Sequence, residues 1–161
     1  MAKKKEEKTN VMRVLEQKNI AYTAHTYPED GPLDGVSVAG YLNQDVEQVF
    51  KTLVTKAAGG AYYVFDIPVA DTLDLKKAAK AVGEKSIAMI LSRELLPLTG
   101  YIRGGCSPVG MKKKFPTYIH ETAIVFDEIY VSAGQRGLQM RVNPEQLADY
   151  VGAPFADLTK A

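Results

Sequence analysis

The sequence has one cysteine, two histidines and no tryptophan. A single cysteine excludes an intramolecular disulfide bond. With only His25 and His120 beside Cys106, the sequence holds no cluster with the spacing of zinc ligands. We therefore expect no structural metal site and no bound cofactor.

A long hydrophobic run and a large excess of one charge are also missing. No apolar stretch approaches the length that spans a bilayer, and residues 1–8 lack the apolar core of a signal peptide. We expect a cytoplasmic protein without a membrane partner. The formal net charge of +1 gives no general argument for nucleic acid binding and none for DNA, so any basic surface must be local.

The 161 residues, of which 46% are hydrophobic and 24% charged, are typical of one soluble globular domain. Residues 1–8 form a charged tail, so the domain is expected over residues 9–161. Hydrophobic periodicity predicts helices near residues 10–19, 37–42, 74–82, 93–96 and 144–151. Strands are expected near residues 22–27, 50–56, 61–67, 87–91, 117–120, 123–126, 129–133, 138–142 and 154–158.

Turn and capping signals connect these elements. Gly59-Gly60 and residues 134–137 each predict a hairpin, and residues 28–35 predict an irregular loop. Ser37 and Ser92 are expected to cap short helices, the second of which ends before Pro97. Hairpins with irregularly interspersed helices predict an α+β fold, with a mixed, mostly antiparallel, barrel-like sheet flanked by helices.

Residues 100–110, Gly-Tyr-Ile-Arg-Gly-Gly-Cys-Ser-Pro-Val-Gly, contain four glycines and one proline. Glycine permits positive φ and close approach of the backbone, so successive N–H groups can bind a carbonyl oxygen, a carboxylate or a phosphate. The segment therefore predicts a binding loop, with an ordinary glycine-rich turn between strands as the alternative.

Lys51 stands among apolar residues of a predicted central strand, next to Phe50 and near Leu53. Burying an ammonium group is costly unless a polar or anionic ligand meets it. Lys51 is therefore a candidate for binding a carboxylate, a phosphate or a developing oxyanion. The alternative is a solvated lysine on the outer face of the strand.

Other reactive residues give weaker signals. Cys106 adjoins Ser107, but no base or cysteine–histidine signature accompanies it, so we do not expect a nucleophile. No Walker loop, dinucleotide fingerprint or metalloprotease helix is present. Several carboxylates are expected at strand ends and helix caps for local structural reasons: Asp66, Asp71, Asp74, Asp127 and Glu128.

Four motifs, together with the early His25-Thr-Tyr27, occur in a characteristic order over nearly the whole chain. They are Phe50-Lys-Thr-Leu53, Leu73-Asp-Leu-Lys-Lys-Ala-Ala-Lys80, residues 100–110 and Val131-Ser-Ala-Gly-Gln-Arg-Gly-Leu-Gln139. The combination resembles the YbaK/EbsC family of bacterial aminoacyl-tRNA deacylases. The resemblance implies a fold similar to the editing domain of bacterial prolyl-tRNA synthetases.

The resemblance also implies an activity: trans-editing, which clears cysteine from mischarged Cys-tRNA(Pro) and, as a further substrate, Cys-tRNA(Cys). The implied partners are the acceptor end of tRNA(Pro) and prolyl-tRNA synthetase. Lys51 falls on the family's catalytic lysine. The implied substrate-binding residues are Tyr27, Thr52, Gly104, Gly105, Ser107, Pro108, Ser132, Ala133, Gly134, Arg136 and Gln139.

In the YbaK branch the substrate's own thiol is thought to attack its ester carbonyl, forming a thiolactone, so the resemblance implies positioning rather than a protein nucleophile. Lys51 is not expected to act as a general base, because the reference pKa of lysine, about 10.4, leaves it protonated at neutral pH. Lys112, Lys113 and Lys114 follow the glycine-rich loop and are expected to contact tRNA phosphates, with a solvated turn as the alternative.

Two residues depart from the family pattern. Gln139 replaces an aspartate of the best-known members, and Ala133 replaces a glycine. Glutamine can hydrogen-bond but carries no charge and cannot accept a proton. Two alternative functions therefore stay open: an editing factor that hydrolyses alanyl or another small aminoacyl-tRNA, and a non-catalytic module that binds aminoacyl-tRNA.

Overall fold

The computed structural model describes residues 8–28 and 34–160. The expected charged tail therefore lies outside the described residues except for Lys8, and so does most of the loop expected over residues 28–35. In chain order the elements are α1 (Asn10–Gln17), β1 (Tyr22–Thr26), α2 (Gly35–Tyr41), β2 (Phe50–Ala57), β3 (Tyr62–Pro68), α3 (Leu75–Val82), β4 (Ile87–Met89), α4 (Ser92–Thr99), β5 (Thr117–His120), the 3-10 helix η1 (Glu121–Val125), β6 (Ile129–Gln135), β7 (Leu138–Val142), α5 (Pro144–Val151) and β8 (Phe155–Ala156).

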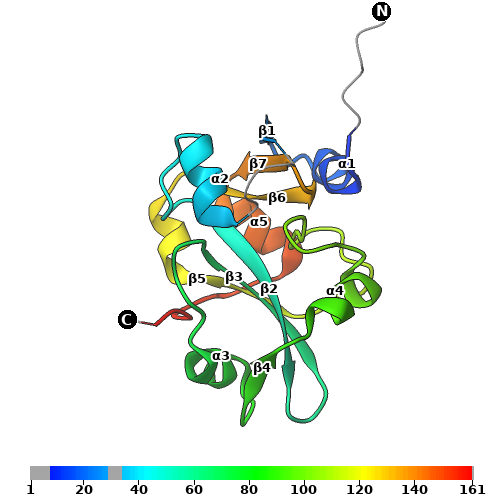
Figure 1. Ribbon diagram of the computed structural model, residues 1–161, viewed down its shortest axis with the longest axis vertical. Helices are drawn as coiled ribbons and strands as arrows, with labels where there is room; N and C mark the ends of the chain where they lie inside the picture. Colours follow the sequence, from blue (N-terminus) through cyan, green and yellow to red (C-terminus); the bar gives the residue numbers. More distant parts are fainter. Residues whose placement is uncertain (1–7, 29–33, 161) are drawn as a thin grey trace, which may run out of the picture.

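The described strands form two sheets, with the orders β1-β7-β6 and β4-β2-β3-β5-β8. Only the pairs β3–β5 and β5–β8 are parallel. Figure 1 shows the three-stranded sheet at one end of the molecule and the long β2–β3 hairpin running away from it. The predicted α+β class and mostly antiparallel pairing are confirmed. The strands described do not close into a barrel, so that part of the prediction is not confirmed.

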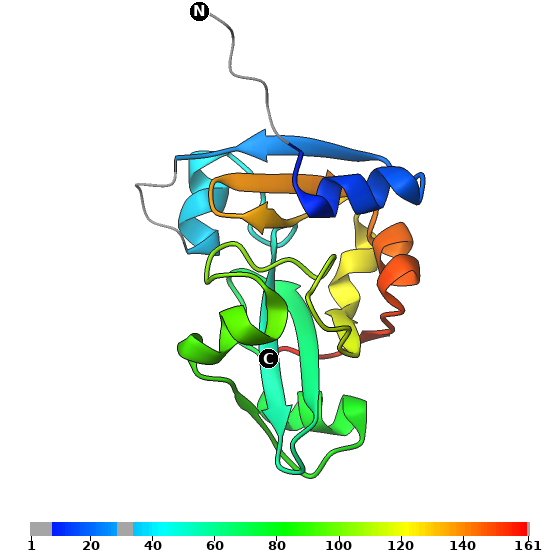
Figure 2. The same cartoon turned by 90° about the vertical axis from the view of Figure 1, so that its right-hand side faces the viewer.

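The two sheets meet where β2 begins. A single parallel bridge joins Val49 to Tyr130, and the backbone N–H of Val69 donates to the Val49 carbonyl. Figure 2 shows the three-stranded sheet, with α1 beside it, crossing the end of the β2–β3 hairpin. Segments that are far apart in the sequence are brought together at this junction.

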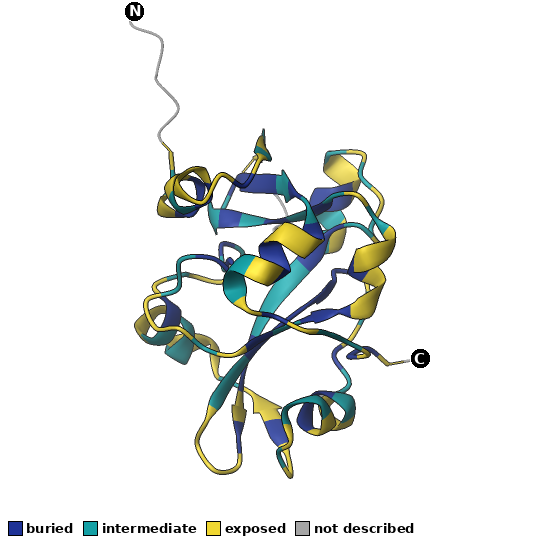
Figure 3. Cartoon of the chain, turned by 180° about the vertical axis from the view of Figure 1, so that it is seen from behind, coloured by how far each residue is buried: buried dark blue, intermediate teal, exposed yellow. Residues whose placement is uncertain are grey.

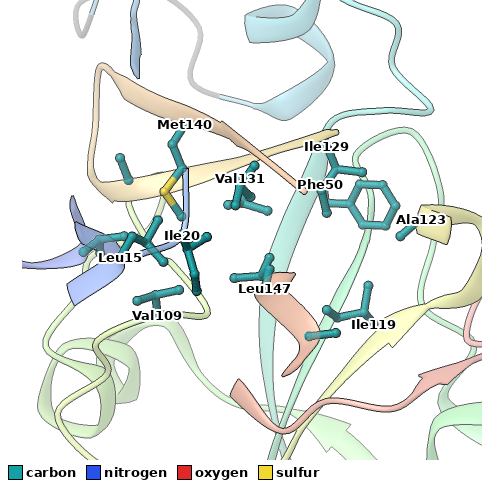
Figure 4. Close-up of a cluster of buried hydrophobic side chains, with 14 of the residues drawn as sticks. Leu15, Ile20, Phe50, Val109, Ile119, Ala123, Ile129, Val131, Met140 and Leu147 are labelled. Carbon is teal, nitrogen blue, oxygen red and sulfur yellow. The ribbon is translucent and has the colours of Figure 1, made fainter. Parts of the chain in front are cut away.

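The larger hydrophobic core lies beneath the junction. Leu15 of α1 packs with β6 and β7 through Val131 and Met140, while Phe50 and Ile119 extend the cluster to the second sheet (Figure 4). A second cluster lies between α3 and the β2–β3 hairpin. The helices turn exposed faces outward and buried faces toward these clusters (Figure 3), as their amphipathic periodicity requires.

The helices predicted near residues 10–19, 74–82 and 144–151 are confirmed as α1, α3 and α5. The Thr9 side chain caps α1, and Asp74 and Asn143 cap α3 and α5. Gly83 ends α3 with φ of 78°, a left-handed conformation in which glycine is not strained. Both predicted hairpins are present, formed by β2 with β3 and by β6 with β7.

Three local predictions were wrong. Residues 121–125 form a 3-10 helix rather than a strand near residues 123–126, because only Ala123 of this short apolar run is buried. Asp34, not Ser37, caps α2, and its carboxylate accepts hydrogen bonds from the Ser37 backbone and hydroxyl. Residue 92 is the first helical residue of α4 rather than its cap.

The end of α4 was also predicted wrongly, because the helix continues through Pro97 to Thr99. The Thr99 hydroxyl donates to the Leu95 carbonyl, and the Gly100 N–H donates to the Leu96 carbonyl. These bonds close the last turn although proline has no N–H. No helix in the two described ranges is long and apolar enough to cross a membrane.

The start of α2 depends on a glycine. A Cβ atom at Gly35 would lie 2.2 Å from Cγ1 of Val69, whereas a Cβ atom at Gly40 would meet nothing within 4 Å. We expect Gly35→Ala to destabilise the protein by about 1–3 kcal/mol through overpacking. Gly40→Ala, the matched control in the same helix, should stabilise it by up to about 1 kcal/mol. Urea unfolding measures both, and an equal effect of the two substitutions would contradict this packing.

Candidate active site

A cavity of about 590 Å³ lies at the junction of the two sheets. Its lining comes from the end of β1, the start of α2, the first half of β2, the loop after α4, and the β6–β7 hairpin. Seven of the predicted site residues line it: Tyr27, Lys51, Thr52, Gly104, Ser132, Arg136 and Gln139. The fold therefore brings together residues from four of the sequence motifs.

The glycine-rich loop is held against the turn of the β6–β7 hairpin. Arg136 Nε donates to the Arg103 carbonyl at 2.7 Å. Gly104 has φ of 86°, and a Cβ atom at Gly105 would lie 3.0 Å from the backbone of Gln135. These glycines allow the loop to approach the hairpin closely and to form one side of the cavity.

The other predicted substrate-binding residues of this region do not line the cavity. Ser107 is buried, and its hydroxyl accepts a hydrogen bond from the Val109 N–H. Ala133 lies in the larger core, and Gly134 makes room for Val11 and Tyr101. Gly105 and Pro108 are likewise absent from the cavity lining. These residues lie outside the cavity lining, within the glycine-rich loop and the β6–β7 hairpin.

Lys51 lines this cavity and also a neighbouring one of about 610 Å³. Its side chain is half-buried, so desolvation lowers the pKa of Lys51, and the charge of Asp71 opposes that change. Of the two alternatives left by the sequence, the cavity-facing position is the one observed. A cation here can stabilise negative charge on a bound ester or phosphate.

Asp66 lies directly behind the cavity surface, and sequence reasoning missed its importance. It pairs with Thr52 across the β2–β3 ladder and is completely buried, so the expected strand-end position was wrong. The Thr52 hydroxyl donates to Oδ1 of Asp66, while Oδ2 has no hydrogen-bond partner among residues 8–28 and 34–160. Burial raises the pKa of Asp66 to about 7, and the Thr52 hydrogen bond opposes the shift. The available signal was an aspartate between Phe65 and Ile67, inside a continuous apolar strand.

Cys106 lines the cavity on the side of the glycine-rich loop. Burial and the charge of Asp66 raise the pKa of the Cys106 thiol to about 12. A thiol in this environment stays protonated at neutral pH, whereas a nucleophilic cysteine requires the thiolate. The side chain therefore belongs to the cavity surface, in agreement with the prediction that it is no nucleophile.

Comparison with known proteins shows the family to which the chain belongs. The family model described as the aminoacyl-tRNA editing domain matches residues 35–150. The chain belongs to the aminoacyl-tRNA editing domain family. The resemblance to the YbaK/EbsC family is confirmed.

Individual relatives and solved structures align with almost the whole of this chain. EbsC of Enterococcus faecalis (strain ATCC 700802 / V583), named for Cys-tRNA(Pro)/Cys-tRNA(Cys) deacylation, is 45% identical over 99% of this chain and 98% of its own. A crystal structure assigned as a trans-editing enzyme for prolyl-tRNA synthetase has a TM-score of 0.83 and 28% identity, covering 94% of this chain and 95% of the other. The hypothetical protein APE2540, 19% identical, shares the fold with a TM-score of 0.85, covering 93% of this chain and 99% of its own.

Gln139 is a buried part of the editing-domain cavity. Its Oε1 accepts a hydrogen bond of 2.7 Å from Nε2 of Gln44, in the segment between α2 and β2. An uncharged amide held in this way can orient a polar ligand but cannot serve as a base. Sequence reasoning did not find Gln44, because its contact with Gln139 spans 95 residues.

The basic run after the glycine-rich loop lies at a different surface of the editing domain. Lys113 and Lys114 line a cavity of about 200 Å³ together with Pro108 and Tyr150. This cavity and the candidate active cavity have no lining residue in common. Lys112 is fixed nearby by its backbone N–H, which donates to the Thr99 carbonyl. The predicted phosphate contacts of these lysines stay a prediction.

The pKa of Asp66 predicts a pH dependence of stability. The unfolded carboxyl ionises near pH 3.8 and the folded one near pH 7, so the folded state holds more protons between these values and its stability falls as pH rises. From pH 5 to pH 8 we expect a loss of about 2–3 kcal/mol from this group. In Asp66→Asn this loss should disappear.

Urea unfolding of the wild type and Asp66→Asn at several pH values measures the difference between their free energies of unfolding. The contributions of the two histidines cancel in this difference. Parallel pH profiles for the wild type and Asp66→Asn would contradict the raised pKa of Asp66.

Proposed function

We propose that this chain is a trans-editing deacylase that removes cysteine from mischarged Cys-tRNA(Pro), with Cys-tRNA(Cys) as a further substrate, and that residues 9–161 act as one domain. One observation carries the proposal: a single cavity is lined by seven of the twelve residues that the family resemblance assigns to catalysis or substrate binding, including Tyr27, Lys51 and Gln139. The name of the 45% identical relative supports the same substrate class.

The cavity suits a small polar group joined to a nucleoside. Its volume of about 590 Å³ lies within the range of about 300–1,000 Å³ typical of small-molecule sites. Val38, Val49 and Val69 give it an apolar part, while Thr52, Ser132 and Arg136 supply polar groups. A cysteinyl ester and part of the terminal adenosine match this combination.

The chemistry requires no nucleophile from the protein. The substrate thiol loses its proton to solvent and its sulfur attacks the ester carbonyl carbon; a carbon–sulfur bond forms, the bond to the 3′-oxygen of tRNA breaks, and that oxygen takes up a proton. Holding thiol and carbonyl together supplies much of the acceleration. The Lys51 ammonium stabilises the negative charge that develops on the reacting oxygens. The neutral thiol of Cys106 takes no part in the reaction.

Two basic groups are candidates for the phosphates of the tRNA acceptor end. The cavity next to the candidate active one is lined by Lys76 and Lys160, and Lys51 and Leu53 line both cavities. Asp74 lines it too, but its carboxylate accepts the backbone N–H groups of α3. These shared lining residues favour this path for the single-stranded 3′ end over the run Lys112–Lys114, whose cavity shares no lining residue with the candidate active cavity.

A complex with prolyl-tRNA synthetase is part of the proposal, because the net charge of +1 favours weak binding of tRNA by this chain alone. The structural neighbour assigned to prolyl-tRNA synthetase editing supports such a partner. A substrate of this class is consistent with a cytoplasmic location.

The activity is tested with Cys-tRNA(Pro), Cys-tRNA(Cys) and Ala-tRNA(Pro), with product analysis for the thiolactone. We expect rapid loss of the cysteinyl esters only, with a decrease of about 100-fold or more in kcat/KM for Lys51→Ala, since the cation that stabilises the reacting oxygens is lost. Lys113→Ala is the matched lysine control and should keep its activity. Cleavage of the alanyl ester alone would reassign the substrate, and binding without turnover would identify a non-catalytic module.

The path of the tRNA is tested by charge reversal. The double variant Lys76→Glu/Lys160→Glu should raise KM for Cys-tRNA(Pro) by about tenfold or more at low salt with kcat unchanged, because phosphate contacts dominate affinity. The control Lys113→Glu/Lys114→Glu carries the same change of charge and should have a KM within about twofold of the wild type. The reverse result would move the acceptor end to the run that follows the glycine-rich loop.

A further inference from the structure

The buried carboxyl of Asp66 has no role in the reaction described so far. It comes from the middle of β3, where its backbone pairs with Thr52 on one side and Ile119 on the other. The residue is fully buried, and Oδ2 has no hydrogen-bond partner within the described part of the chain. A buried polar atom left in this way is costly, so its retention requires a reason.

Thr52 connects this carboxyl to the cavity. Thr52 lines the cavity, Asp66 does not, and the Thr52 hydroxyl donates to Oδ1 of Asp66. A hydroxyl has one hydrogen to donate and two lone pairs that accept. Because the hydrogen is used by the ionised carboxylate, Thr52 can only accept a hydrogen bond from a ligand in the cavity. When Asp66 is protonated it can donate to Thr52, and the hydroxyl hydrogen of Thr52 is then available to the cavity.

We propose that Asp66 is a positioning residue: through Thr52 it sets whether this side of the active cavity accepts or donates a hydrogen bond, and its ionised form selects the hydrogen-bond donors of a cysteinyl group. Those donors are the α-amino group and the thiol. The inference rests on the proposed function, because it takes the aminoacyl end of the substrate to occupy this cavity.

The surroundings of Asp66 leave its protonation sensitive to pH near neutrality. Burial raises the pKa of the carboxyl to about 7, and the hydrogen bond from Thr52 of β2 opposes the shift. The titratable group on the loop side is Cys106, whose own raised pKa keeps it neutral over this range. β5 contributes the apolar Ile119. Lys51 is next to Thr52 in β2, but the acid that acts on its pKa is Asp71.

The test measures the Kd of a stable amide analogue, 3′-cysteinylamido-3′-deoxyadenosine, between pH 5.5 and 8.5. For the wild type we expect affinity to fall by about fivefold to tenfold as Asp66 takes up a proton, the usual effect of losing one hydrogen bond. In Asp66→Asn only the titration of the ligand itself should remain. Thr52→Val should bind weakly at every pH, and Thr52→Ser, which keeps the hydroxyl, should restore the wild-type profile.

A double variant separates positioning from a merely structural role. If Asp66 acts through Thr52, adding Asp66→Asn to Thr52→Val causes no further loss of affinity. Additive losses, or a wild-type pH profile that persists in Asp66→Asn, would overturn the proposal. The alanyl analogue, which lacks the thiol, identifies the donor: an equal pH effect assigns the α-amino group, and an effect on the cysteinyl analogue alone assigns the thiol.

Binding and turnover keep the two proposals apart. A wild type that binds the analogue with a profile dependent on Asp66 but cleaves no ester would remove the deacylase function and retain the role of Asp66. Cleavage of Cys-tRNA(Pro) with the same pH profile in the wild type and in Asp66→Asn would retain the deacylase function and remove the role of Asp66.

Discussion

The antiparallel register between β2 and β3 is the constraint on which the candidate site depends. It places Thr52 opposite Asp66 and Lys51 opposite Ile67. A shift of the register by one residue would place Phe65 or Ile67, instead of the buried acid, opposite Thr52. The turn that sets this register is tight: Gly60 has φ of 102°, and its N–H donates to the Ala57 carbonyl at 2.9 Å.

The cavity also takes part of its lining from the three-stranded sheet. Ser132 and Gln139, which face each other on β6 and β7, supply its other side. The relative position of the two sheets is fixed below the cavity by apolar contacts, among them Phe50 of β2 and Ile129 of β6 in the shared core. A site formed between two sheets therefore depends on core packing as much as on its polar residues, and substitutions in the core should alter it without touching the ligand.

The elements that sequence reasoning predicted well are those decided by neighbours in the chain. Asn143 with Pro144 specifies a helix start, and Gly59-Gly60 specifies a hairpin, because each signal acts within a few residues. The run at residues 123–126 was mistaken for a strand because a short apolar segment has the same composition in either conformation. Which residues of this run are buried depends on tertiary packing, which the local sequence pattern does not specify.

Some residues of the candidate site could likewise be predicted from the sequence, and others could not. The family resemblance identified Lys51, Thr52 and Gln139, and all three line the cavity. Asp66 was placed with ordinary strand-end carboxylates, because its significance appears only when β2 and the glycine-rich loop cover it. The sequence signal was an acid within an apolar strand. Only the register of β3 against β2 shows that this acid lies next to Thr52 of the cavity lining.

Lys51 and Thr52, adjacent residues of β2, make the two ends of the proposed site chemically different. Thr52 lines only the active cavity and is bonded to an acid, whereas Lys51 lines both the active cavity and its neighbour. A cysteinyl ester has the matching asymmetry, with hydrogen-bond donors on the amino acid and negative phosphates on the nucleotide side. In the proposed complex the amino acid is therefore placed beside Thr52 and the nucleotide beside Lys51, with the ester carbonyl between them. Alternation along a single strand can thus orient a substrate without a protein nucleophile or a metal ligand.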